Sequence, residues 1–191
     1  MLDVHVLHRT STDTLPSIFD NGLRYGEHGS HSQDERVRRT NEFLNAACPE
    51  DLKGQGVDRK DSLYCYLGVG ENKVFDVASG RVVDLERWDV GAGNAKLGLL
   101  IDPDTTFVSD LDAYDALLER LDEQVSERAL AGLAREYWHR LVCLSDVQAH
   151  YRLEDEALVA VSTSPPGLPR RLERVEVLVT ADVAPQDIAR I

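Results

Sequence analysis

The arrangement of strand-like and helical segments along the chain is the feature that most constrains its fold. Residues 4–7 and 175–179 are rich in valine and apolar except for His5 and Glu176, which is typical of β-strands. Between them, from 111 to 144, apolar residues recur at helical spacing. Strands at both ends with helices between them predict an α+β fold for residues 1–191, as a single domain with a helical insertion near 111–144.

The charge of the chain limits the partners that we expect. Asp and Glu number 34 against 21 Lys and Arg, which gives a formal net charge of −13. An acidic surface repels nucleic acid and anionic membranes unless positive charge is concentrated locally. Arginines cluster at 36, 38 and 39 and again at 170, 171 and 174. No apolar run approaches the ~18 residues that a membrane span needs, so we expect no membrane partner.

The cysteines indicate the compartment. Cys48, Cys65 and Cys143 are odd in number, widely spaced and without a C-x-x-C pair. This usage favours a reducing environment over a disulfide framework, and it offers no metal-ligand spacing. The first residues also lack the basic and apolar regions of a signal peptide. We therefore expect a cytoplasmic protein with no metal.

The N-terminal segment predicts a strand, a helix and a tight end to that helix. The strand leads to His8, and Pro16 suits the first turn of a helix because its missing N–H costs nothing there. Gly22 favours the left-handed conformation that ends many helices. This order places His8 and the hydroxyl of Thr10 at the mouth of a crevice, where a ligand would bind.

Three further residues, Glu176, Tyr64 and Tyr66, are candidates for catalysis or ligand binding. Glu176 is the one carboxylate in an apolar strand, so it faces either solvent or a cavity, and a buried carboxylate needs a partner or a role. Tyr64 and Tyr66 share one face of the strand expected at 62–67. Their rings either pack in the core or stack on a planar heterocycle.

Three segments together resemble the motifs of the ADP-ribosyltransferase superfamily. Residues 7–11 (LHRTS), followed by LPSIF at 15–19 and NGL at 21–23, are similar to its first motif and to the opening of DarT-type toxins. Residues 62–67 stand where the second motif supplies a tyrosine. Residues 175–179 resemble the third motif, with Glu176 in the catalytic position. Arg9 departs from the glycine that poly(ADP-ribose) polymerases have after the histidine.

The resemblance implies split antiparallel β-sheets around a cleft for NAD, the co-substrate. Glu176 would stabilise positive charge on the ribose while the nicotinamide–ribose bond breaks. His8 and Thr10 would orient a ribose or the nicotinamide, and Tyr64 or Tyr66 would stack on the nicotinamide ring. The pyrophosphate would meet basic side chains, either Arg9 or one of the helix arginines Arg36, Arg38 and Arg39. The acceptor of ADP-ribose is unidentified, and a toxin-like effector is one form of such an enzyme.

Other functions are compatible with the same motifs. One alternative is an RNA 2′-phosphotransferase or an NAD glycohydrolase on the same fold, and another is a binding domain without catalysis. The enzymatic hypotheses share one structural expectation, which is that His8 and Glu176 face the same cleft.

Overall fold

The computed structural model describes residues 1–25, 34–121 and 125–191. Its helices are α1 (Leu15–Asn21), α2 (Glu35–Ala46), α3 (Glu50–Gly54), α4 (Leu111–Arg120), α5 (Glu127–His139) and α6 (Leu144–His150). Its strands are β1 (Val4–Ser11), β2 (Leu63–Val69), β3 (Lys73–Asp76), β4 (Arg81–Asp84), β5 (Asn94–Leu99), β6 (Thr106–Asp110), β7 (Val142–Cys143), β8 (Tyr151–Glu154), β9 (Ala157–Ala160), β10 (Arg171–Leu172), β11 (Val175–Val179) and β12 (Ile188–Arg190). Short 3₁₀ turns occupy Thr12–Thr14, Pro103–Thr105 and Pro185–Asp187. None of the described helices has both the length and the apolar character that a membrane span requires.

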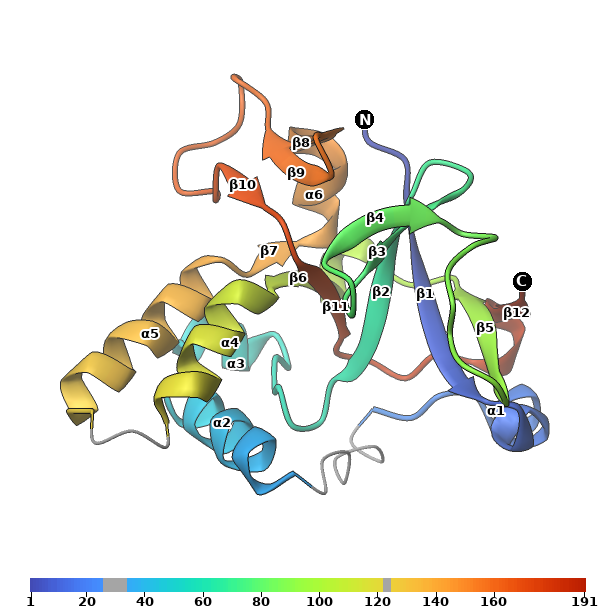
Figure 1. The fold of residues 1–191 in the computed structure, drawn as a ribbon, viewed down its shortest axis with the longest axis horizontal. Coiled ribbons are helices and arrows are strands. Elements are labelled where there is room, and N and C mark those ends of the chain that lie inside the picture. The colour runs from blue at the N-terminus through green and yellow to red at the C-terminus, as the bar shows by residue number, and fades with distance from the viewer. Residues whose placement is uncertain (26–33, 122–124) are drawn as a thin grey trace.

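The main sheet joins the two ends of the chain. Its strand order is β12-β5-β1-β2-β11-β6-β7, with β3 and β4 attached to β2 (Figure 1). Neighbouring strands in it are antiparallel, and β8, β9 and β10 form a second small sheet. The predicted α+β class is therefore confirmed, and the strands of the first and last motifs both pair with β2.

The main sheet divides between β1 and β2. Their shared register ends where Leu7 faces Tyr66. Past this point, His8–Ser11 continue in register with β5, whereas Leu63–Cys65 continue with β11. Figure 1 shows β1 and β2 together at their upper ends and apart at their lower ends. The strands diverge at the residues that the first and second motifs single out.

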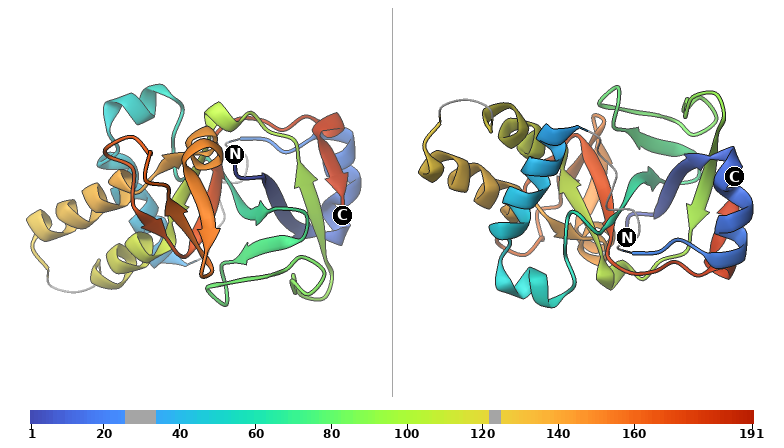
Figure 2. Two further views of the ribbon diagram at one scale, coloured as in Figure 1. Left: turned by 90° about the horizontal axis from the view of Figure 1, so that it is seen from above. Right: turned by 90° about the horizontal axis from the view of Figure 1, so that it is seen from below.

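Strand β11 is buried on both faces. Val177 packs in the core that includes Ile18 of α1 and Val147 of α6. Its neighbour Leu178 packs in a second core with residues of the helices on the other face, namely Leu44, Leu117 and Tyr137. Side chains alternate along a strand, so Glu176 lies on the same face as Leu178, toward the helices. The pair predicted at 111–144 is confirmed as α4 and α5, which extend to one side while α1 and β12 lie at the other (Figure 2).

The predicted N-terminal helix is also confirmed. Pro16 lies in the first turn of α1, and the side chain of Ser11 caps the preceding 3₁₀ turn by accepting from the backbone N–H of Asp13. The helix ends at Gly22, whose N–H donates to the carbonyl of Ile18. Gly22 has φ +80°, and a Cβ there would meet the carbonyl oxygen of Val183 at 2.3 Å. This glycine is therefore required by conformation and by space.

We predict that Gly22→Ala lowers the free energy of unfolding by about 1–3 kcal/mol, because the substitution strains the backbone at positive φ. Gly54→Ala is the matched control, since a Cβ on Gly54 meets nothing within 4 Å and alanine favours a helix by up to about 1 kcal/mol. Urea denaturation followed by circular dichroism measures both. Equal stability of the two variants would contradict the prediction.

Candidate functional site

The first cavity lies where β1 and β2 diverge. Its volume is about 840 Å³. It is lined by His8, Arg9, Thr10, Ser11, Thr14, Ser17, Ile18, Asn21, Gly22, Leu23, Arg24, Ser62, Leu63, Tyr64 and Asn94. Among these side chains are two arginines, several hydroxyls and two amides, but no carboxylate, in a chain with 34 Asp and Glu. The cavity therefore offers hydrogen bonds and positive charge in an otherwise acidic protein.

His8 contacts a buried cysteine at the point where the strands part. Nδ1 of His8 lies 3.7 Å from Sγ of Cys65. Burial raises the pKa of the Cys65 thiol, and the nearby charge of Glu176 raises it further. The thiol is therefore protonated at neutral pH. This contact ties the ring of His8 to β2 although the two strands no longer pair there.

A second cavity, of about 760 Å³, lies on the helix side of the sheet. It is lined by Val37, Arg38, Asn41, Glu42, Arg59, Lys60, Tyr64, Val77, Leu111, Tyr114, Asp115, Arg174 and Glu176. Tyr64 lines both this cavity and the first one. The two cavities therefore share one lining residue, Tyr64.

Glu176 is buried in this second cavity and is held by two side chains. Its exposed fraction is 7%. On the neighbouring strand β6, Ser109 is directly opposite in register, and its hydroxyl donates to Oε1 of Glu176 at 2.9 Å. Nη1 of Arg59 lies 2.5 Å from the same oxygen. The carboxylate thus has an ionic partner and a hydrogen-bond donor, as a buried charge requires.

Arg59 is itself almost fully enclosed, with 3% of its surface exposed. Its Nε donates to Oδ1 of Asn41 at 3.1 Å, and its Nη1 donates to the hydroxyl of Tyr137 at 2.5 Å. The ring of Tyr114 lies 4.1 Å from the guanidinium carbon, close enough for a cation–π contact. Burial, the largest single influence, lowers the pKa of Arg59. The charge of Glu176 and the nearby tyrosines together outweigh this effect, and the pKa is raised.

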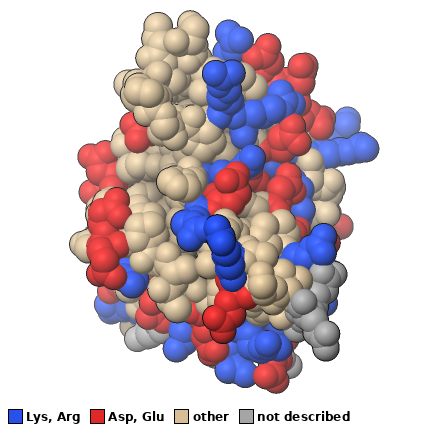
Figure 3. Space-filling model, turned by 90° about the vertical axis from the view of Figure 1, so that its left-hand side faces the viewer, with Lys and Arg blue, Asp and Glu red and all other residues tan. Residues whose placement is uncertain are grey.

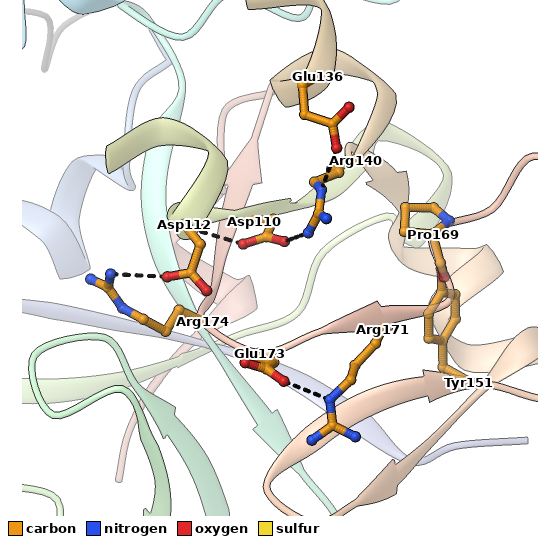
Figure 4. Close-up of polar contacts among 9 residues, drawn as sticks. All are labelled: Asp110, Asp112, Glu136, Arg140, Tyr151, Pro169, Arg171, Glu173 and Arg174. Carbon is orange, nitrogen blue, oxygen red and sulfur yellow. Dashed lines mark hydrogen bonds and ion pairs between the residues drawn. The ribbon is translucent and has the colours of Figure 1, made fainter. Parts of the chain in front are cut away.

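Ion pairs next to Glu176 fix β11 against α4. Arg174 lies two residues before Glu176 and binds Asp112 at 3.1 Å and Asp115 at 2.6 Å. Close by, Arg140 pairs with Asp110, the residue that caps α4 (Figure 4). On the side of the molecule shown in Figure 3, basic and acidic side chains are interspersed. These contacts stabilise the strand that carries the carboxylate.

The structure brings some of the predicted site residues together and separates others. His8, Arg9, Thr10 and Tyr64 line the first cavity. The alternative that Glu176 faces solvent is wrong, because the residue is buried. The expectation that His8 and Glu176 face one cleft is also wrong, because they line different cavities.

The physical reason is the direction of the side chains on neighbouring strands. Val177 of β11 is opposite Cys65 of β2, and residues directly opposite in a sheet point to the same face. His8 is on that face because it contacts Cys65, whereas Glu176 precedes Val177 and points to the other face.

Three of the candidate ligand contacts, Tyr66, Arg36 and Arg39, lie outside both cavities. The ring of Tyr66 packs edge-on against Trp88 at 4.6 Å between ring centres, and Tyr66 lines neither cavity. Of the two tyrosines, Tyr64 is therefore the one placed to meet a ligand. Arg36, Arg38 and Arg39 all lie on α2. Arg38 lines the second cavity, whereas Arg39 lines neither.

Sequence reasoning missed the partners of Glu176. Arg59 stands in a polar segment with Asp58, Lys60 and Asp61, where nothing marks it for burial. Ser109 follows Phe107 by two residues along strand β6. Alternation from Phe107 would have placed Ser109 on the helix side, which is the one signal that the sequence contains.

Comparisons with known proteins add no assignment, since no protein-family model, curated protein or solved structure matches this chain. Within residues 1–25, 34–121 and 125–191, no group of three or more His, Cys, Asp or Glu side chains is placed to hold a metal ion.

We predict that the native protein has one reactive thiol. Burial raises the pKa of Cys48 to about 11 and also raises that of Cys65, so both remain protonated at pH 8, and the thiolate is the reactive form. Cys143 is only half-buried. Ellman's reagent should therefore react quickly with one thiol in the native protein and with all three in denaturant. The fast reaction should disappear in Cys143→Ser, and a fast thiol remaining in that variant would contradict this assignment.

Proposed function

We propose that this protein is an NAD-dependent ADP-ribosyltransferase. The observation that carries the proposal is the position of Tyr64, which joins the polar cavity between the diverging strands to the cavity that contains Glu176. His8, Tyr64 and Glu176 come from three adjacent strands, β1, β2 and β11. The split of the sheet between β1 and β2 also agrees with the split sheets that the sequence resemblance implies.

The first cavity has the chemistry to bind a dinucleotide. Its volume of about 840 Å³ is within the ~300–1,000 Å³ range of small-molecule sites. Arg9 is exposed at its wall and forms no ion pair with a described residue, so its guanidinium can bind a diphosphate through paired hydrogen bonds. Hydroxyl and amide side chains around it suit ribose and carboxamide groups.

Because His8 and Glu176 line different cavities, we place different parts of NAD in each. The diphosphate and one ribose occupy the first cavity, beside Arg9 and His8. The nicotinamide-bearing ribose then lies at Tyr64, within the reach of Glu176 from the second cavity. His8 and Glu176 therefore act on different parts of one ligand rather than in one cleft.

The reaction breaks the bond between C1′ of that ribose and the nicotinamide nitrogen. Both electrons of the bond leave with nicotinamide, which departs as a neutral molecule, and positive charge develops on the ribose. The negative carboxylate of Glu176 stabilises this charge. An acceptor then adds its electron pair to C1′ and loses a proton. With water as acceptor the same steps give NAD hydrolysis.

We predict that Glu176→Gln lowers the rate of nicotinamide release from labelled NAD by roughly 10²–10³-fold, the usual effect of removing one electrostatic stabiliser. Glutamine keeps the size of the side chain and its hydrogen-bonding capacity but removes the charge. Glu173→Gln is the matched control, because Glu173 is exposed and pairs with Arg171 outside both cavities.

The assay is run with water alone, with nucleic acid and with cell extract as sources of acceptor. Label on a macromolecule supports transfer, and free ADP-ribose alone supports the hydrolase alternative. A 2′-phosphorylated RNA that loses its phosphate to NAD would support the phosphotransferase. NAD binding without any product would support a binding domain, and absence of NAD binding by calorimetry would overturn the proposal.

We also predict that Arg9→Gln weakens the binding of NAD about tenfold, the effect of losing one charge-assisted hydrogen bond. Nicotinamide riboside has no phosphate, so its affinity should change little. Arg87→Gln is the control, because Arg87 is exposed and lines neither cavity. Calorimetry with both ligands measures the effect. Equal weakening for NAD and for the riboside would show that Arg9 does not bind the diphosphate.

A further inference from the structure

The two oxygens of the Glu176 carboxylate have different surroundings. Ser109 donates to Oε1, and Arg59 Nη1 makes its close ionic contact with the same atom. No side chain or backbone group in the described part of the chain donates a hydrogen bond to Oε2. Glu176 nevertheless lines the second cavity. One oxygen is therefore anchored to the protein, and the other is available for a ligand.

The anchor is rigid because Arg59 is held from several elements at once. Asn41 of α2 accepts from its Nε, and Tyr137 of α5 accepts from its Nη1. Its backbone N–H donates to Oδ1 of Asn45 at 2.9 Å, and its backbone carbonyl accepts from the hydroxyl of Tyr64. Movement of the guanidinium would break these contacts, so its position and that of Oε1 are fixed together.

The geometry points to Arg59 and Ser109 as positioning residues, which hold Oε1 of Glu176 so that Oε2 accepts a hydrogen bond from a hydroxyl of the reacting ribose. This inference rests on the proposed function and adds to it the atom of Glu176 that meets the substrate. Arg59 also lines the second cavity, but here it acts through the carboxylate. Neither residue lines the first cavity, where the diphosphate binds.

A purely structural ion pair would behave differently. Loss of such a pair lowers stability, and the fully folded fraction then keeps its turnover number. Loss of positioning lowers kcat and leaves KM for NAD nearly unchanged, because binding depends on the other cavity. The split between kcat and KM in folded protein therefore separates the two roles.

The test compares Ser109→Ala, Tyr137→Phe and Arg59→Lys with wild type. Ser109→Ala removes the donor to Oε1, and Tyr137→Phe removes the hydroxyl that anchors Nη1. We expect kcat for nicotinamide release to fall about tenfold or more in each, because small displacements at a reacting centre have effects of this size. KM for NAD should change less than about threefold. Arg87→Gln is the matched control, since Arg87 is exposed and lines neither cavity.

Arg59→Ala adds a second measurement. It leaves a space for a guanidinium ion beside the second cavity, so added guanidinium should restore part of kcat at concentrations that do not unfold the protein. The same salt should not restore Glu176→Gln. Lysine at 59 should keep more activity than alanine, because it retains the positive charge.

The outcomes separate this inference from the proposed function. A folded Ser109→Ala with kcat within twofold of wild type overturns the positioning role and leaves the proposed function standing. Variants that melt at a lower temperature but keep the wild-type kcat would likewise overturn the positioning role and leave the proposed function standing. A wild-type protein that neither binds NAD nor releases nicotinamide overturns the proposed function, and the inference with it.

Discussion

The buried ion pair of Arg59 and Glu176 joins the helices to the main sheet at the candidate site. Removing both charges from water is costly, and a buried pair is stable only where further hydrogen bonds satisfy the remaining donors and acceptors. Here Asn41 of α2, Tyr137 of α5 and Ser109 of β6 supply them. Three elements that are distant in sequence must therefore meet around one carboxylate on β11. The pair links the fold of this region to the geometry of the candidate site.

The divergence of β1 and β2 is the second constraint. Where β1 and β2 no longer pair with each other, each stays paired along its outer edge, β1 with β5 and β2 with β11. The sheet therefore opens without leaving either strand wholly unpaired. The opening removes side-chain packing from His8–Ser11 and gives that space to a polar cavity. Antiparallel pairing on the outer sides keeps its walls fixed. The binding surface is therefore built into the sheet rather than placed on an added loop.

The sequence predicted the α+β class, the N-terminal strand and helix, and the pair α4–α5, because each has a local periodic signal. It also singled out Glu176, whose carboxylate interrupts an apolar strand. It could not predict the burial of Arg59, since that depends on aromatic side chains from α4 and α5. It also placed His8 and Glu176 in one cleft. The order of motifs along a chain carries no information on which face of a strand each residue points to, and a shift of one residue reverses that face.

Tyr64 connects the two cavities that separate His8 from Glu176. The residue lines both cavities, and its hydroxyl donates to the backbone carbonyl of Arg59. A ligand that displaced this ring would also disturb the backbone from which the guanidinium extends. Tyr64 is therefore the residue through which binding in the first cavity would affect the position of the carboxylate in the second. In a chain of net charge −13, this arrangement keeps the one buried carboxylate of β11 away from the cavity that would receive an anionic diphosphate, and close to the place where positive charge would develop.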